Sequence, residues 1–330
     1  MHALLTPVRA VKLLTVLAMG LATSLAANSA LAADAPVRWK FKEGETLNYV
    51  LERGVEGKLN LTGSEIVFKM GMAFDVAWKA KSVAADGNAE LELTIDRMQI
   101  NMASPLGGNL AYDSTKPEAA GGVMWAQMEP MVTGMLNQTF RLKVTPLGKV
   151  SDIELPQKLT DVFLKQQQSP NRQAGFGIGG SAFSEKGIKE LIEKSVLPLP
   201  EAAPAKDVSW VQHFDNPIRG AGNQMTDTTF TFAGTESVDG KQLAKIAAKT
   251  EMTFEPVENP MADVEITSQE GSGTFLFDAQ AGHLIKATGV QTFFLEMTGA
   301  RDLTQDMKET MSMRVGKSPA APADAKASAK

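Results

Sequence analysis

Few residues in this chain have the types and spacing that catalysis or metal binding requires. The 330 residues include three histidines and no cysteine, so a zinc site built from Cys and His ligands lacks most of its donors. The members of a Ser-His-Asp triad are distant in the sequence and meet only in the folded protein. The chain has no G-x-S-x-G motif that would mark a nucleophilic serine for His213 or His283. We therefore predict no catalytic site, no metal site and no cofactor. A hydrolase whose site is assembled from distant residues stays open as an alternative.

The segment from Gly175 to Gly180 (GFGIGG) has the glycine spacing of a dinucleotide-binding turn. A polar run rather than a strand precedes it, whereas a dinucleotide site needs a strand before the turn and a helix after it. We interpret it as part of a long loop at residues 168–183. Phe176 and Ile178 stand where a plain linker more often has Ser or Asn, so we predict a flap that contacts a bound ligand. A disordered connection is the alternative.

Methionine is unusually frequent, with 17 residues against two tyrosines. The flexible thioether side chain adapts to irregular shapes, which suits a cavity for flexible apolar ligands. Ordinary core packing would explain the same composition. On the first interpretation, the predicted ligand-contacting residues outside the loop are Met70, Met72, Phe74, Met128, Met131 and Met135.

The first 32 residues are typical of a secretory signal peptide. Arg9 and Lys12 precede an apolar run at residues 13–25, and Ala30 and Ala32 provide the small residues of a cleavage site. That run is too short for a membrane span, which needs roughly 20 residues. We predict cleavage after Ala32 and export to the periplasm or beyond, as a protein that does not span the membrane.

The composition limits the partners that the exported chain could have. Loss of Arg9 and Lys12 reduces 33 basic residues to 31, against 38 acidic residues, for a net charge of −7. Nucleic-acid binding needs clustered Lys and Arg, which this acidic chain lacks. Without cysteine there is neither a disulfide framework nor an acceptor for N-terminal lipidation. The expected partner is an apolar small molecule, a lipid or another envelope protein.

Alternating apolar residues predict that most of the chain forms β-strands. From Phe68 to Trp78 every second residue is apolar, which places six side chains on one sheet face. The alternation at residues 91–95 resumes out of phase at Met98, which predicts a β-bulge near Asp96 and Arg97. Further strands are expected at 208–214, 228–238, 243–254, 264–277, 283–297 and 307–315. Helices are expected at 122–136, 155–167 and 184–196, the last with Ser184 as its N-cap.

No polar linker divides the chain, so we predict a single β-rich domain at 33–316 and a disordered tail at 317–330. Hairpin-like segments with similar sequences recur in both halves. They favour an internal duplication of about 38–165 and 200–316, with chance similarity between hairpins as the alternative.

Three short motifs give the chain a resemblance to a known family. These are Trp39 to Glu45 followed by Tyr49, Leu199-Pro200 followed by Val208-Ser209-Trp210, and Gly273 to Asp278 followed by Gly282 and Leu284. Across residues 38–316 the chain resembles an uncharacterised family of secreted bacterial proteins, a domain of unknown function, which implies no activity. The order of strands and helices is also similar to that of the periplasmic lipoprotein-carrier fold, which suggests lipid binding.

The predicted fold is mainly β with α: a curved antiparallel sheet or half-barrel with two or three helices packed on its concave face. The predicted function is that of an exported, non-enzymatic envelope or periplasmic protein that binds a lipid or other apolar ligand. A structural or assembly partner in the cell envelope is the first alternative, and the hydrolase described above is the second.

Overall fold

The computed structural model describes residues 36–318, apart from 62, 106–107, 118–119, 169–183, 204, 219–220, 259, 261 and 300–301. The predicted signal peptide with its cleavage after Ala32 lies outside the described residues. So do Phe176, Ile178 and residues 319–330 of the predicted tail. The duplication of 38–165 and 200–316 stays a prediction.

The described chain is mainly β, with a single antiparallel sheet and three helices, as the sequence predicts. The helices are α1 (Gly122–Met135), α2 (Gln157–Gln168) and α3 (Glu185–Ser195). The strands are β1 (Thr46–Leu61), β2 (Ser64–Val83), β3 (Ala89–Ser104), β4 (Gly108–Asp113), β5 (Thr139–Val144), β6 (Val150–Glu154), β7 (Ser209–Ile218), β8 (Gly222–Val238), β9 (Lys241–Pro256), β10 (Ala262–Asp278), β11 (His283–Gly299) and β12 (Leu303–Val315).

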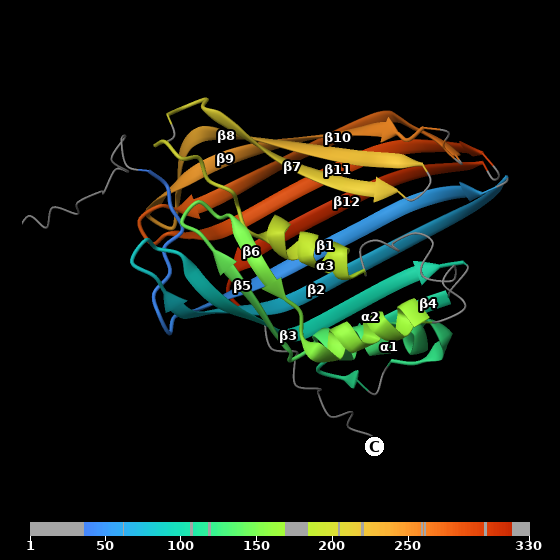
Figure 1. Cartoon of the computed structure of the whole chain (residues 1–330), viewed down its shortest axis with the longest axis horizontal. Coiled ribbons are helices and arrows are strands. Elements are labelled where there is room, and N and C mark those ends of the chain that lie inside the picture. The colour runs from blue at the N-terminus through green and yellow to red at the C-terminus, as the bar shows by residue number, and fades with distance from the viewer. Residues whose placement is uncertain are drawn as a thin grey trace, which may run out of the picture.

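The sheet is open and follows the order β6-β5-β3-β2-β1-β12-β11-β10-β9-β8-β7, while β4 pairs with the second half of β3. The first and last strands meet in the middle of the sheet, where β1 pairs with β12 from Tyr49 to Leu61. Figure 1 shows α3 in front of β1 and β12, and α1 with α2 beside β3 and β4. The two edge strands of the main order are therefore β6 and β7.

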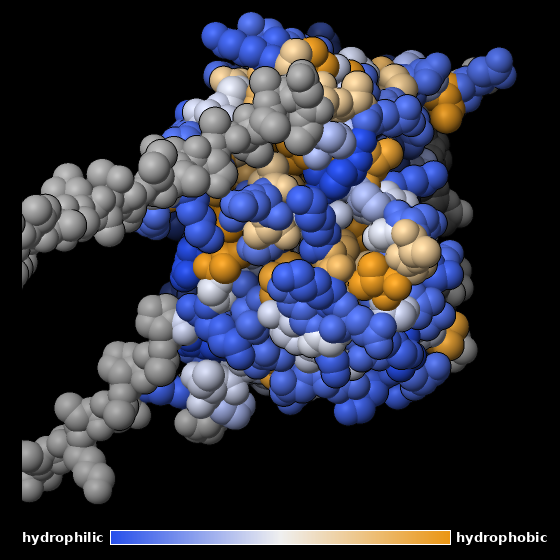
Figure 2. Space-filling view, turned by 90° about the vertical axis from the view of Figure 1, so that its left-hand side faces the viewer, coloured by the Kyte–Doolittle hydropathy of each residue, from blue (hydrophilic) through white to orange (hydrophobic). Residues whose placement is uncertain are grey.

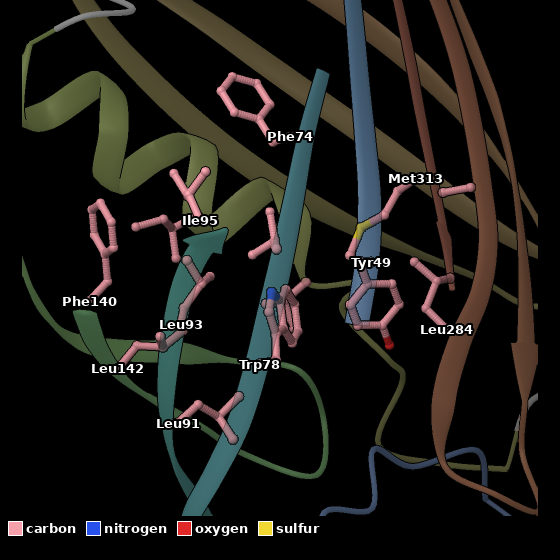
Figure 3. Packing of buried hydrophobic residues seen from close by; sticks show 14 of the residues in the cluster. Tyr49, Phe74, Trp78, Leu91, Leu93, Ile95, Phe140, Leu142, Leu284 and Met313 are labelled. Carbon is pink, nitrogen blue, oxygen red and sulfur yellow. The ribbon is translucent and has the colours of Figure 1, made fainter. Parts of the chain in front are cut away.

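The long alternating segment forms β2, and its apolar side chains share one face as predicted. The predicted bulge is confirmed: Asp75 pairs with Arg97 and Val76 pairs with Ile95, which leaves Asp96 as the extra residue. This shift explains how two runs of apolar residues with different phase can face the same core. Figure 3 shows this core, with Leu91 and Leu93 of β3 near Leu142 and Phe140 of β5.

The sequence did not predict the central strand β1 or the short strand β4, whereas the hairpin-like segment at 140–150 forms β5 and the start of β6. The β1 segment TLNYVLERGVEGKLNL mixes charges and glycines, so its alternation is weak. The glycines have a packing reason, because a Cβ on Gly57 would collide with Met307 and lie 2.7 Å from the ring of Phe68. Neighbouring strands that flank β1 on both sides override its weak local preference.

One end of the sheet is tied together by the segment before β1. Backbone hydrogen bonds join Trp39 N–H to the carbonyl of Pro146 at 2.9 Å and Lys40 N–H to the carbonyl of Gly282 at 2.8 Å. The first carbonyl belongs to the β5–β6 turn and the second to the β10–β11 turn. This end segment, residues 36–42, therefore bridges two turns that are far apart in the strand order.

Trp39 is the anchor of the end segment. Its side chain is almost fully buried, and its Nε1–H donates to the carbonyl of Leu197 at 2.9 Å. Its ring lies edge-on to Phe277 at 5.1 Å and tilted against Trp78 at 6.1 Å. One indole therefore contacts β2, β10 and the chain that follows α3.

The tight packing at this end predicts that Gly148→Ala destabilises the protein strongly. Gly148 has a φ of +76°, and an added Cβ would collide with the carbonyl of Leu197 and lie 2.9 Å from Trp39 Nε1. We expect a loss of about 2 kcal/mol or more in the free energy of unfolding, measured by urea denaturation.

Gly44→Ala is the matched control, because Gly44 has a φ of +79° and no atom within 4 Å of the added Cβ. It should cost about 1 kcal/mol for the backbone conformation alone. Equal losses for the two variants would contradict the packing role assigned to Gly148.

Candidate functional site

An apolar cavity of about 140 Å³ lies among helices α1 and α3 and strands β1, β2, β3, β5 and β12. Its walls are mainly aliphatic, thioether and aromatic side chains. The lining consists of Tyr49, Leu51, Arg53, Val55, Phe68, Met70, Met72, Phe74, Val76, Trp78, Leu93, Ile95, Met135, Phe140, Ile188, Leu191, Ile192, Ser195, Met307, Glu309 and Met313. Figure 3 shows part of this wall, with Phe74 and Trp78 at different levels along β2 and Tyr49 beside Trp78.

Strand β2 gives the cavity its length. Its six apolar side chains from Phe68 to Trp78, at every second position, all line the cavity. Ten residue steps of a strand span about 33 Å. The wall that β2 contributes is therefore about as long as a ten-residue extended chain.

Helix α3 forms the opposite wall, and its local sequence explains its position. Ser184 caps the helix, accepting a hydrogen bond from Gly187 N–H at 3.0 Å, as predicted. Ile188, Leu191 and Ile192 share one helical face and line the cavity. Lys189 and Glu185 form an ion pair at 2.9 Å on another face.

The structure places the predicted ligand-contacting residues in two groups. Met70, Met72, Phe74 and Met135 line the cavity. Met128 and Met131 are buried in the core on α1 but are not part of the lining. Contact of any of them with a ligand stays a prediction.

The charged residues of the cavity wall, Arg53 on β1 and Glu309 on β12, were not predicted from the sequence. The Arg53 Nη2 donates to both carboxylate oxygens of Glu309, at 3.0 and 3.1 Å. Both side chains are largely buried, exposing 22% and 33% of their surface. In the sequence, each of the two charged residues stands at a position where the alternation of its strand otherwise has apolar residues. For Arg53 this signal is visible only once β1 is recognised as a strand.

Lys194 lies in the last turn of α3. Its Nζ is 4.6 Å from the centre of the Phe214 ring on β7. Solvent reaches the side chain, yet surrounding protein desolvates the ammonium and thereby lowers the pKa of Lys194. The negative charges of Glu190, Glu309 and Glu193 oppose this lowering of the pKa, and the positive charge of Arg53 adds to it.

A second, polar groove separates α3 from the edge strand β7. It is lined by charged residues of α3 and by His213, Phe214 and Asp215. Lys186 Nζ donates to the carbonyl of Asp215 at 2.9 Å, so the helix is attached to the edge strand. Helix α3 thus has an apolar cavity on one side and a polar groove on the other.

His213 is the histidine in this groove, and both of its ring nitrogens are engaged. Nδ1 lies 2.6 Å from Asp227 Oδ1, and Nε2 lies 3.0 Å from Asp215 Oδ1. A triad histidine needs one nitrogen facing the nucleophile, whereas here a carboxylate oxygen faces each ring nitrogen of His213. Among the described residues, no group of three or more His, Asp or Glu side chains is arranged to hold a metal ion.

A family of unknown function, DUF6263, has a sequence model that matches residues 86–313, more than half of the chain. The chain belongs to this family. The resemblance to an uncharacterised family is therefore confirmed, and membership assigns no activity. No curated protein matches the sequence significantly.

Solved structures with some likeness to this chain are distant. Lipovitellin has a TM-score of 0.44 and 12% identity, and the match covers 86% of this chain but only 26% of lipovitellin. A Bacteroides fragilis protein with a YmcC-like fold gives 0.21 and 9%, covering 86% and 100% of the two chains. A Vibrio parahaemolyticus outer-membrane lipoprotein-sorting domain gives 0.14 and 8%, covering 82% and 86%. At these scores the likenesses carry no argument about function.

The surface at the end bridged by residues 36–42 carries both hydrophobic and hydrophilic residues. Figure 2 views the molecule from this end and shows hydrophobic residues between hydrophilic ones. In the part of the chain that the structure describes, no helix is both long enough and apolar enough to cross a bilayer.

The two carboxylates around His213 predict a raised pKa for this histidine. Hydrogen bonds to Asp227 and then Asp215 favour the charged ring. Its contribution to stability is present below the ordinary pKa of about 6.5 and is lost as pH rises through the raised value. An NMR titration of the His213 ring should show a pKa above the ordinary value, and Asp227→Asn should lower it. A His213 pKa that Asp227→Asn leaves unchanged would contradict this assignment.

Proposed function

We propose that this protein is an exported binding protein that holds the acyl chain of a lipid, or a similar elongated apolar molecule, in the cavity under α3. The observation that carries the proposal is the unbroken line of β2 side chains, from Phe68 to Trp78, along one wall of the cavity. Five of these six side chains are also buried in the core, yet a cavity of about 140 Å³ remains beside the line.

We also infer that the sheet curls around α3, so that the helix lies in its concave face. The helix lines the same cavity as β2 and also bonds to β7 through Lys186. Seven strand spacings separate β2 from β7 in the sheet, which is about 34 Å along the sheet. A helix with a diameter of about 10–12 Å can contact both only if the sheet bends around it.

The chemistry of the lining favours an apolar and flexible ligand. Burial of each methylene group contributes about 0.8 kcal/mol. A cavity of about 140 Å³ is close to the size that holds the six carbons of benzene, so about six buried methylenes would supply about 5 kcal/mol. Met70, Met72 and Met135 can adjust their rotamers to chains of different shape. The protein therefore accommodates a class of chains and need not fit a single shape.

Binding without catalysis is part of the proposal. The cavity lining offers Tyr49 and Ser195 as hydroxyl groups, but Ser195 Oγ donates to the Ile192 carbonyl at 2.6 Å. No histidine is among the residues that line it. Export rests on the sequence of residues 1–32, which has the three parts of a signal peptide.

Leu191→Trp tests the proposal by filling the cavity from the α3 side. The probe is N-phenyl-1-naphthylamine, whose fluorescence rises in apolar surroundings, followed by competition with a phospholipid extract. We expect saturable binding to the wild-type protein and at least tenfold weaker binding to Leu191→Trp, because the indole occupies the space of the chain.

Leu164→Trp is the control, since Leu164 is an exposed leucine on helix α2 and does not line the cavity. It should bind the probe like the wild type. Absence of saturable probe binding to the wild type, or equal loss in both variants, would overturn the proposal. Native mass spectrometry of the protein from its own cells should show a bound lipid mass that Leu191→Trp lacks.

A further inference from the structure

The lining of the apolar cavity ends at the same level on three neighbouring strands. On β2 the lining starts at Phe68, while Ile66, two positions earlier on the same face, is not part of it. On β12 the lining ends at Met307, and on β1 it ends at Val55. The next position of β1 on this face is Gly57, which has no side chain to contribute. The cavity therefore has a defined end at this row of the sheet.

The residues of this row are direct cross-strand neighbours. Gly57 pairs in register with Phe68 of β2 and with Met307 of β12. The side chains of Phe68 and Met307 thus share one face of the sheet, on either side of the glycine. A Cβ on Gly57 would collide with Met307 Sδ and would lie 2.7 Å from the Phe68 ring. Both side chains therefore lie over Gly57, and together they close the space above β1.

These side chains belong to a small buried cluster of their own. Val55, Phe68 and Met307 form this cluster, apart from the main core to which Met72 belongs. Residues of both clusters line the cavity, so the cavity lies between the small cluster and the main core. Partly buried Met70 packs against both. The small cluster is therefore a partition at the end of the cavity.

Buried apolar surface continues on the far side of this partition. Leu59 of β1 and Ile66 of β2 pair with each other in the next row of the sheet. Both side chains are buried, and neither lines the cavity. Successive residues on one face of a strand are about 6.6 Å apart, so the side chains of a single row separate the cavity from this surface. The length of the cavity is therefore limited by Phe68 and Met307 and not by the end of the apolar face.

We propose that Phe68 and Met307, packed over Gly57, are the end wall of the cavity and determine the length of chain that the protein accepts. This inference rests on the proposed function and adds the size class of the ligand. A cavity of about 140 Å³ is close to the size that holds benzene, so the inserted part of the chain is about six carbons long. Further carbons of a longer ligand remain outside the cavity.

Straight-chain alcohols from butan-1-ol to dodecan-1-ol are the probes, because they share a head group and differ only in length. Displacement of N-phenyl-1-naphthylamine gives the affinity of each alcohol. For the wild type we expect the affinity to rise about fourfold per methylene group up to about six carbons and then to level off. The affinities for hexan-1-ol and nonan-1-ol should therefore be similar.

Met307→Ala should lengthen the cavity, because it removes Cγ, Sδ and Cε from the end wall. The rise in affinity should then continue for about three more carbons, so that nonan-1-ol binds about tenfold or more tightly than hexan-1-ol. Phe68→Ala should shift the preference in the same direction. It keeps the test valid if Met307→Ala does not fold, which circular dichroism checks.

Met128→Ala is the matched control, because Met128 is as deeply buried as Met307 but does not line the cavity. It should keep the wild-type ratio of the affinities for the two alcohols. The same preference for nonan-1-ol in Met128→Ala would indicate a general loosening of the core and would overturn the end wall.

The outcomes separate this inference from the proposed function. If the wild type binds hexan-1-ol but the ratio stays near one in both Met307→Ala and Phe68→Ala, the end wall is overturned and the chain cavity remains. A wild-type affinity that keeps rising beyond nonan-1-ol also overturns it. If no alcohol binds to the wild type, the proposed function fails, and the end wall fails with it.

Discussion

The burial of Trp39 between the two halves of the sheet is the contact on which the rest of the structure depends. An open sheet with edges at β6 and β7 has no ladder of hydrogen bonds to close it. The end segment replaces that ladder at one end, because its backbone bonds to the Pro146 and Gly282 carbonyls while the indole contacts Trp78 and Phe277. The end segment and its indole therefore connect the two halves of the sheet at one end.

Helix α3 lies between the apolar cavity and the polar groove. The Trp39 Nε1 bond to Leu197 and the Trp210 Nε1 bond to the Pro198 carbonyl, both 2.9 Å, fix the chain just after the helix. The same contacts that close the end therefore position Ile188 and Leu191 over β2 and Lys194 over β7. The cavity, its ion pair and the polar groove follow from this placement of one short helix between distant strands.

The sequence predicted the features that depend on local pattern and missed those that depend on neighbours. The alternation in β2, the bulge at Asp96 and the cap at Ser184 could all be predicted from spacing. The central strand β1 could not, because glycines such as Gly57 reflect close packing against Met307. Arg53 and Glu309 were not predicted for the same reason, because they meet only across paired strands. Of the six predicted site residues that the structure describes, four line the cavity. The three motifs that resemble the family contain Trp39, Trp210 and Gly282. They meet at the end bridged by residues 36–42 and at the chain just after α3, so their residues hold the fold together.

A chain in the space beside β2 would contact the methionines of the cavity wall, so their NMR signals report most directly on whether it binds there. With methyl-¹³C-methionine labelling, NMR spectra can be recorded while palmitate is added to the protein. The account predicts that the methyl signals of Met70, Met72 and Met135 shift, because these residues line the cavity. The signals of Met128 and Met131, buried on the same helix as Met135 but outside the lining, should stay in place. Shifts confined to Met128 and Met131, or no shift at any methionine, would contradict the account.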